Sequence, residues 1–133
     1  MRRDAARPVL FIDRSLGRGM VEALRRAGAA VESHDQHFAQ DAPDEEWLEH
    51  AGRQGWIVIT KDRKIRYRPN EMAAYRDHGV LGVFLSNGNA TGEENASLML
   101  AALPAIEALS ASATPPAMYR LGANGGLTLW EQF

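Results

Sequence analysis

The stretch WIVITKDRKIRYRP, residues 56–69, joins an apolar segment to a charged one. Residues 56–60 are apolar and rich in β-branched side chains, which is typical of a strand buried on both faces of a parallel sheet. The run stops at Lys61 and Asp62, and the charged segment carries five basic residues: Lys61, Arg63, Lys64, Arg66 and Arg68. The apolar strand is typical of an α/β fold, and the aspartate that follows it is a candidate ligand of a functional site.

Strand and helix patterns alternate along the rest of the chain. The predicted strands are 9–12, 29–33, 56–60 and 80–85, and the predicted helices are 17–27, 43–54, 70–78 and 91–109. This alternation indicates an α/β fold with a mainly parallel central sheet and helices on both faces. Residues 34–43 are polar and loop-like, and Pro104 is expected to bend or split the last helix. The tail predicts a C-terminal hairpin around Asn124–Gly125.

Length and composition limit the class of protein. The chain has 133 residues, 45% of them hydrophobic, which predicts a single domain, 1–133, with a core of about 9–110 and a hairpin of about 117–130. Because the net charge is only −2, attraction to nucleic acid must come from a local patch such as 61–68. The chain has no cysteine, no signal-peptide pattern and no membrane-spanning run, so we expect a cytoplasmic protein without disulfides.

Acidic residues follow the carboxyl ends of two predicted strands. Asp13 ends the first strand, and Asp62 follows the third by two residues. The helix that opens at Pro43 begins with acids as well, among them Asp44 and Glu46. In an open α/β sheet all of these positions lie at one edge, where ligands bind.

The helix spacing indicates which of its acids reach that edge. Asp44 lies three and four residues before Trp47 and Leu48, so it continues their apolar stripe toward the sheet. Glu46 points sideways and reaches the edge from the flank. Carboxylates gathered in this way repel one another unless a cation lies between them, and Mg²⁺ or Mn²⁺ prefers such oxygen ligands.

Each of these features also has a purely structural explanation. An aspartate after a strand commonly serves as a turn residue, and acids at a helix start compensate the helix dipole. The basic run can be a solvated loop, and His34 and His37 are expected to make ordinary hydrogen bonds in a loop, with a metal pair as the alternative. The coincidence of the acids at one predicted edge favours a metal site.

Three segments together resemble the PIN-like nucleases, in particular the compact branch related to VapC-type toxins. They are FIDRSLG (11–17), HDQHFAQDAPDEEWLEHA (34–51) and GWIVITKDRKIR (55–66), and the resemblance covers roughly residues 9–95. It implies a three-layer PIN-like α/β fold and an acidic Mg²⁺ or Mn²⁺ site for RNA cleavage. Carried onto matching positions, the catalytic and metal-binding acids are Asp13, Asp44, Glu46 and Asp62.

The end of the fourth predicted strand departs from the family pattern. Many PIN domains place a further acid there, whereas this chain has Ser86, Asn87 and Asn89. A neutral ligand at this position would weaken a second metal site or accompany a loss of activity. The number of metal ions therefore stays open.

The resemblance implies a metal-dependent endoribonuclease similar to toxins of type II toxin–antitoxin systems. The basic residues of 61–68 would contact the RNA backbone, which gives affinity but little sequence choice. A cognate antitoxin is a further partner of that class, and apolar residues of the last helix and the tail predict a homodimer. Two alternatives stay open: a catalytically inactive PIN-like module that binds RNA or protein, and a phospho-acceptor signalling domain, which Arg14 after Asp13 disfavours.

Overall fold

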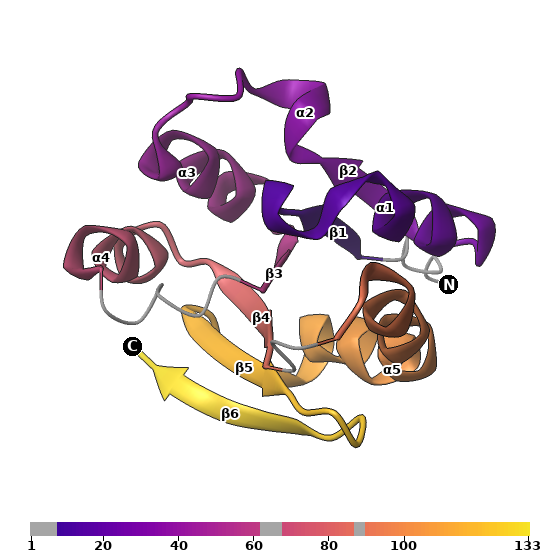
Figure 1. Ribbon diagram of the computed structural model, residues 1–133. Coiled ribbons are helices and arrows are strands. Elements are labelled where there is room, and N and C mark those ends of the chain that lie inside the picture. Colours follow the sequence, from indigo (N-terminus) through magenta and orange to yellow (C-terminus); the bar gives the residue numbers. More distant parts are fainter. Residues whose placement is uncertain (1–7, 62–67, 87–89) are drawn as a thin grey trace, which may run out of the picture.

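The computed structural model describes residues 8–61, 68–86 and 90–133 (Figure 1). The elements, in chain order, are β1 (Val9–Ile12), the 3₁₀ helix η1 (Arg14–Leu16), α1 (Gly17–Arg26), β2 (Ala30–Ser33), α2 (His34–His37), α3 (Asp44–Gln54), β3 (Ile57–Thr60), α4 (Pro69–Asp77), β4 (Leu81–Leu85), α5 (Gly92–Ser112), β5 (Ala117–Leu121) and β6 (Leu127–Gln132). Among the described residues, no helix is long and apolar enough to cross a lipid bilayer.

The strands form one six-stranded sheet in the order β2-β1-β3-β4-β5-β6. All neighbouring pairs are parallel except β5 and β6, which are antiparallel. The predicted mainly parallel sheet and C-terminal hairpin are therefore confirmed. The hairpin turn contains Gly125 in a left-handed conformation, with φ of 85°, and Asn124 Oδ1 accepts a hydrogen bond from the N–H of Gly126 at 3.0 Å.

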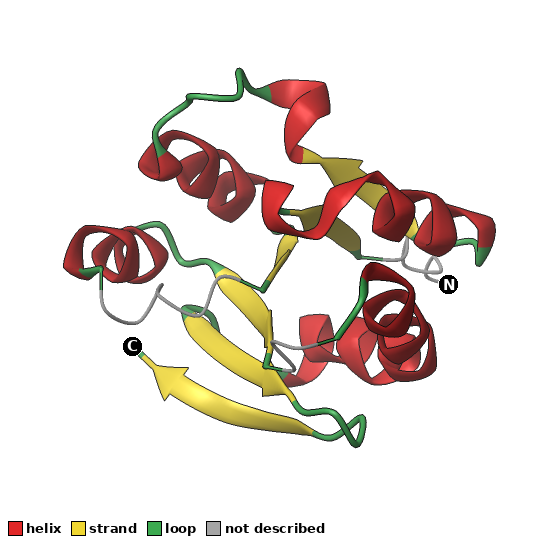
Figure 2. Ribbon diagram, viewed as in Figure 1, coloured by secondary structure: helices red, strands yellow, loops and turns green. Residues whose placement is uncertain are grey.

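Helices cover both faces of the sheet and make three layers (Figures 1 and 2). Because successive side chains of a strand point to opposite faces, Leu10 and Ile12 pack with α1 and α5, whereas Phe11 packs with α3 and α4. The strands β3 and β4 are buried along their whole length, as expected for central strands of a parallel sheet. The sheet is thus a rigid support for the residues that follow its carboxyl ends.

The order of the strands reverses beside β1. From β1 the chain adds β2 on one side and then crosses to add β3 on the other side. In an open α/β sheet, such a switch point leaves a crevice at the carboxyl ends of the two strands between which the order reverses. Here these strands are β1 and β3, which end at Ile12 and Thr60.

Two local predictions differ from the structure. Residues 34–37 form α2 rather than loop, because Gln36 Oε1 accepts a hydrogen bond from the N–H of Ser33 at 2.9 Å, half of a capping box. Pro104 does not split α5, which is assigned as one helix. Pro104 is exposed while Leu103 and Ile106 are buried, so burial of that face outweighs the hydrogen bond that proline removes.

Candidate active site

Asp13 lies at the switch point, directly after β1. Its N–H donates to the carbonyl oxygen of Ile59 at 3.0 Å, which continues the pairing of β1 with β3 by one residue. Its carboxylate oxygen Oδ2 accepts hydrogen bonds from the hydroxyls of Ser15 at 2.8 Å and Thr60 at 2.9 Å. Within the described part of the chain, Oδ1 accepts no hydrogen bond. The carboxylate is therefore fixed through one oxygen, which leaves the other for a ligand.

Asp44 opens α3 and is positioned from the sheet through an aromatic side chain. Trp47, one turn later, is buried and stacks on Phe11 of β1 with ring centroids 5.5 Å apart. The indole Nε1–H of Trp47 donates to Asp44 Oδ1 at 3.1 Å. The contact of α3 with the sheet thus determines where the Asp44 carboxylate lies.

Glu71, in the first turn of α4, is a buried carboxyl group that the sequence interpretation did not include in the site. Glu71 is only 8% exposed, and Arg68 Nη1 donates a hydrogen bond to Glu71 Oε1 at 3.2 Å. Burial raises the pKa of Glu71 to about 7, helped by a hydrogen bond and charge repulsion from the Asp44 carboxyl group and opposed by Arg68. The acids of α3 and α4 therefore meet across the helix pair.

These three acids line one pocket of about 720 Å³. Asp13 comes from the end of β1, Asp44 from the start of α3 and Glu71 from the start of α4, while Thr60 of β3 completes this side of the wall. Arg68, predicted to bind RNA, lines the same pocket. Segments that are far apart in the sequence thus place carboxylate and hydroxyl oxygens and a positive charge in the same pocket.

Other predicted site residues lie elsewhere or outside the described residues. Glu46 is exposed on α3 and is not among the residues that line the pocket, and Lys61 is exposed, with its N–H donating to Ser15 Oγ at 3.3 Å. Ser86 donates to the carbonyl oxygen of Leu121 at 3.2 Å and does not line the pocket either. The positions outside the described residues are Asp62, Arg63, Lys64, Arg66, Asn87 and Asn89.

The donor set suits a hard divalent cation, although the described acids alone do not form a complete site. Carboxylate oxygens are the ligands that Mg²⁺ and Mn²⁺ prefer. Among residues 8–61, 68–86 and 90–133, no three His, Cys, Asp or Glu side chains are arranged closely enough to hold a metal ion. Asp62, which follows Thr60 by two residues, is the acid that the sequence adds to this set.

The sequence around Glu71 contains a pattern that could have indicated its place in the site. Arg68 and Glu71 are three residues apart across a proline, and proline in the first turn marks the start of a helix. An acid in the first turn compensates the helix dipole, which is how such a residue is ordinarily interpreted. Only the packing of α4 against α3 distinguishes this acid from an ordinary helix-start residue.

Comparison with known proteins agrees with this geometry. A sequence model of the PIN like domain matches residues 8–87, from the start of β1 to just beyond the end of β4. The chain belongs to the PIN-like domain family. The match includes Asp13, Asp44 and Glu71, and the resemblance seen in the sequence is confirmed.

A curated relative of this PIN-like protein comes from Mycobacterium tuberculosis (strain ATCC 25618 / H37Rv) and is named "Putative ribonuclease VapC45". The two sequences are 31% identical over 102 residues, which cover 73% of this chain and 74% of the relative. No solved structure matches the PIN-like chain.

Proposed function

We propose that this PIN-like protein is a metal-dependent endoribonuclease of the VapC toxin type. The observation that carries the proposal is the convergence of Asp13, Asp44 and Glu71, from three separate elements, on one pocket at the switch point of the sheet. The relative named as a ribonuclease supports the same activity. A cognate antitoxin is the protein partner that this class implies.

The acids of the pocket would hold Mg²⁺ or Mn²⁺. We assign Asp13, Asp44 and Asp62 as ligands and place Glu71 with them, because Glu71 lines the pocket and Glu46 does not. The cation, when bound, would supply an activated water and stabilise the charge that develops on the phosphate. Ser15 and Thr60 would hold the Asp13 carboxylate in one orientation, through the hydrogen bonds that they donate.

The basic residues near the pocket would bind the RNA backbone. Arg68 lines the pocket and pairs with Glu71, so its guanidinium lies beside the acids. Lys61, Arg63, Lys64 and Arg66 precede it in the chain and would add further phosphate contacts. Such contacts raise affinity for any RNA sequence and weaken as salt increases.

Cleavage of a mixed RNA pool by wild type and by Asp13→Asn, each with Mn²⁺ and with EDTA, tests this function. Asparagine keeps the size of the side chain but removes the charge that would hold the cation. We expect cleavage only by wild type with Mn²⁺, and a loss of at least about a hundredfold in the variant. The variant should unfold at no lower temperature, because relief of carboxylate repulsion offsets the lost contacts.

The other outcomes of this comparison are equally informative. Equal cleavage in all four conditions would mean a contaminating nuclease or a different mechanism. No cleavage in any condition, with RNA binding retained, would favour a PIN-like module that binds RNA without cutting it.

A further inference from the structure

The pocket extends well beyond the acids. A second part of it, here called the α1–α2 arm, runs between α1 and the end of β2 with α2. The residues that line the arm are Gly17, Arg18, Val21, Glu22, Arg25, Ser33, His34, Asp35 and Gln36. The proposed cleavage chemistry uses none of these side chains.

His34 is a buried polar residue in the wall of the arm. Its side chain is 3% exposed and packs against the rings of Phe11, Phe38 and Trp47. Its Nδ1 is buried and has no hydrogen-bond partner among the described residues, and the Asp35 carboxylate is 4.0 Å away. Burial and, after it, the nearby Arg14 lower the pKa of His34, so the imidazole is neutral at neutral pH. A buried polar atom without a partner is destabilising, so such an atom is rarely retained unless a ligand or a water binds it.

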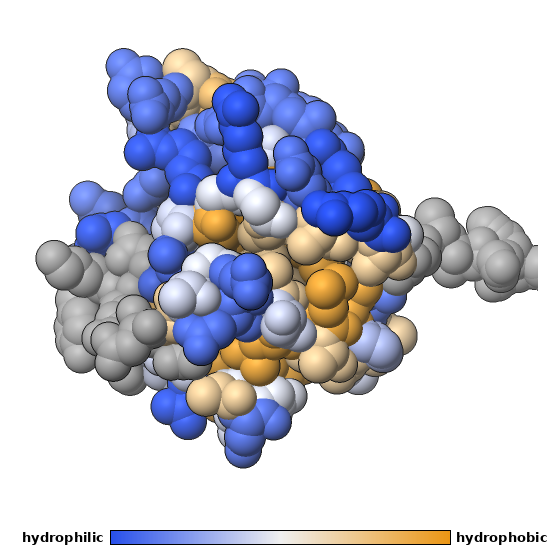
Figure 3. Space-filling view, turned by 45° about the vertical axis from the view of Figure 1, so that its right-hand side comes forward, coloured by the Kyte–Doolittle hydropathy of each residue, from blue (hydrophilic) through white to orange (hydrophobic). Residues whose placement is uncertain are grey.

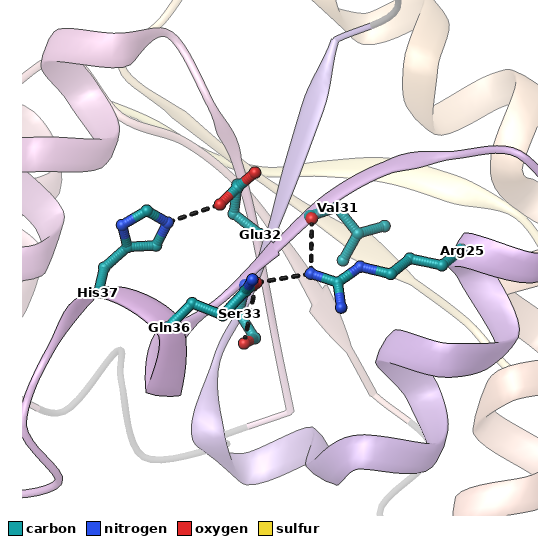
Figure 4. Close-up of polar contacts among 6 residues, drawn as sticks. All are labelled: Arg25, Val31, Glu32, Ser33, Gln36 and His37. Atoms are coloured by element: carbon teal, nitrogen blue, oxygen red, sulfur yellow. Dashed lines mark hydrogen bonds and ion pairs between the residues drawn. The ribbon is translucent and has the colours of Figure 1, made fainter.

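A polar network holds α2, the helix that begins with His34, against its neighbours (Figure 4). Arg25 Nη2 donates to the carbonyl oxygen of Val31 at 3.0 Å and to Gln36 Oε1 at 2.6 Å. Gln36 Oε1 also accepts from the N–H of Ser33, and His37 contacts Glu32 at 2.6 Å. The network ties α2 to α1 and β2, so the His34 ring is held in place before any ligand arrives.

Positive charge lies on the α1 side of the arm. The exposed Arg18 lies in the first turn of α1, and in the described part of the chain no hydrogen bond or ion pair holds its guanidinium. No side chain of residues 8–61, 68–86 or 90–133 caps this helix, and no acid lies in its first turn, so these residues do not compensate the positive end of its dipole. The acids of the arm, Glu22 and Asp35, lie outside the first turn of α1, so the amino end of α1 with Arg18 is the position that suits a phosphate.

We propose that the α1–α2 arm is a nucleotide subsite, which holds the nucleotide adjacent to the phosphate at Asp13. The phosphate of that nucleotide would lie at Arg18 and the amino end of α1, and its ribose hydroxyl or base edge would form a hydrogen bond with His34. A neutral imidazole suits this role because it binds a neutral polar group without a charge to desolvate. The proposal rests on the proposed ribonuclease function, since the nucleotide belongs to the RNA substrate.

Binding measurements without cleavage test the subsite. The probe is a fluorescein-labelled single-stranded RNA 12-mer of mixed sequence, titrated in EDTA with Asp13→Asn protein, and a DNA 12-mer of the same sequence is the comparison. His34→Leu should weaken RNA binding about tenfold, the effect of one hydrogen bond, while thermal stability is unchanged or higher. His34→Asn, whose amide can replace Nδ1, should retain most of the affinity. A loss confined to RNA identifies the ribose hydroxyl as the partner, and an equal loss with DNA identifies the base edge.

Arg18→Ala should also weaken RNA binding. It should make the slope of log affinity against log salt less steep by the amount expected for the loss of one phosphate contact. Arg26→Ala is the matched control, because Arg26 is also an exposed arginine of α1 but does not line the pocket. Wild-type affinity in both His34→Leu and Arg18→Ala, or no RNA binding at all, would overturn the subsite. If wild type cleaves RNA but both variants bind RNA as wild type does, only the subsite proposal is overturned. If RNA binding depends on His34 but wild type cleaves no RNA, only the ribonuclease proposal is overturned.

Discussion

Asp13 and Glu71 lie in one pocket but in different surroundings. Asp13 is held by two hydroxyl donors, which fix the orientation of its carboxylate. Glu71 is buried against another carboxyl group, which stabilises its protonated form. In the absence of a cation, the site is therefore under electrostatic strain at neutral pH, and this strain can be measured through Glu71.

Replacing Glu71 by Gln should change how stability depends on pH. The pKa of Glu71 is raised from 4.5 to about 7 on folding, so its contribution is fully present below pH 4.5 and is lost as pH rises through about 7. We expect Glu71→Gln to unfold at a higher temperature than wild type at pH 8 in EDTA, and to differ little from it at pH 4.5. Thermal unfolding across this pH range checks the prediction.

Glu46→Gln is the control for that experiment, because Glu46 is exposed on α3 and does not line the pocket. Its stability should follow that of wild type at every pH. The same pH dependence in wild type and in Glu71→Gln would contradict the burial of Glu71 beside Asp44.

The pairing of α3 with α4 decides whether their acids meet. Gly52 on α3 lies so close to α4 that a Cβ at this position would overlap the carbonyl oxygen of His78. The absence of a side chain therefore permits the close approach of the two helices. The first turns of the same helices carry Asp44 and Glu71, so the spacing of the helices controls the spacing of these carboxyl groups.

Gly52→Ala should push α4 away from α3. We expect a loss of about 1–3 kcal/mol in the free energy of unfolding, as for other overpacked contacts, and reduced cleavage of RNA because Glu71 is displaced. Urea unfolding and the cleavage assay with Mn²⁺ check the two parts. Gly19→Ala, in α1 where a Cβ would meet no atom, is the matched control and should be neutral or stabilising. Equal stability of the two variants would show that α3 and α4 are not in such close contact.

At the scale of the whole molecule, one edge of the sheet and some apolar surface are uncovered. β6 is one of the two outer strands of the sheet, and its Leu129 is 50% exposed, while Leu100 of α5 is 38% exposed. Figure 3 shows apolar surface in the middle of one face, bordered by hydrophilic residues. Exposed strand edges and apolar patches favour association between chains.

We therefore predict a two-fold homodimer at tens of micromolar, measured by sedimentation velocity. Leu129→Lys should shift the protein toward monomer, because a charge in the exposed apolar surface opposes the burial of that surface in an interface. Thr128→Lys, at the neighbouring exposed position of β6, is the control for added charge and should leave the dimer intact. Sedimentation of wild type as monomer alone would contradict the prediction.

Much of this protein follows from short segments of its sequence. Alternating apolar runs and helical stripes predicted the mainly parallel sheet, and Asn124–Gly125 predicted the hairpin, because periodicity and turn chemistry act over a few residues. The place of Asp13 after a strand and of Asp44 at a helix start could be predicted for the same reason. Each of these properties depends on residues that are neighbours in the chain.

Only the tertiary structure decided which of these segments meet. The placement of β3 beside β1 brings the Thr60 hydroxyl to Asp13 across 47 residues of sequence, and the packing of α4 on α3 brings Glu71 to Asp44. The burial of His34 likewise follows from aromatic side chains of β1 and α3. Burial and long-range contact depend on the whole folded chain, because an acid or an imidazole has the same local pattern whether it faces solvent or a pocket.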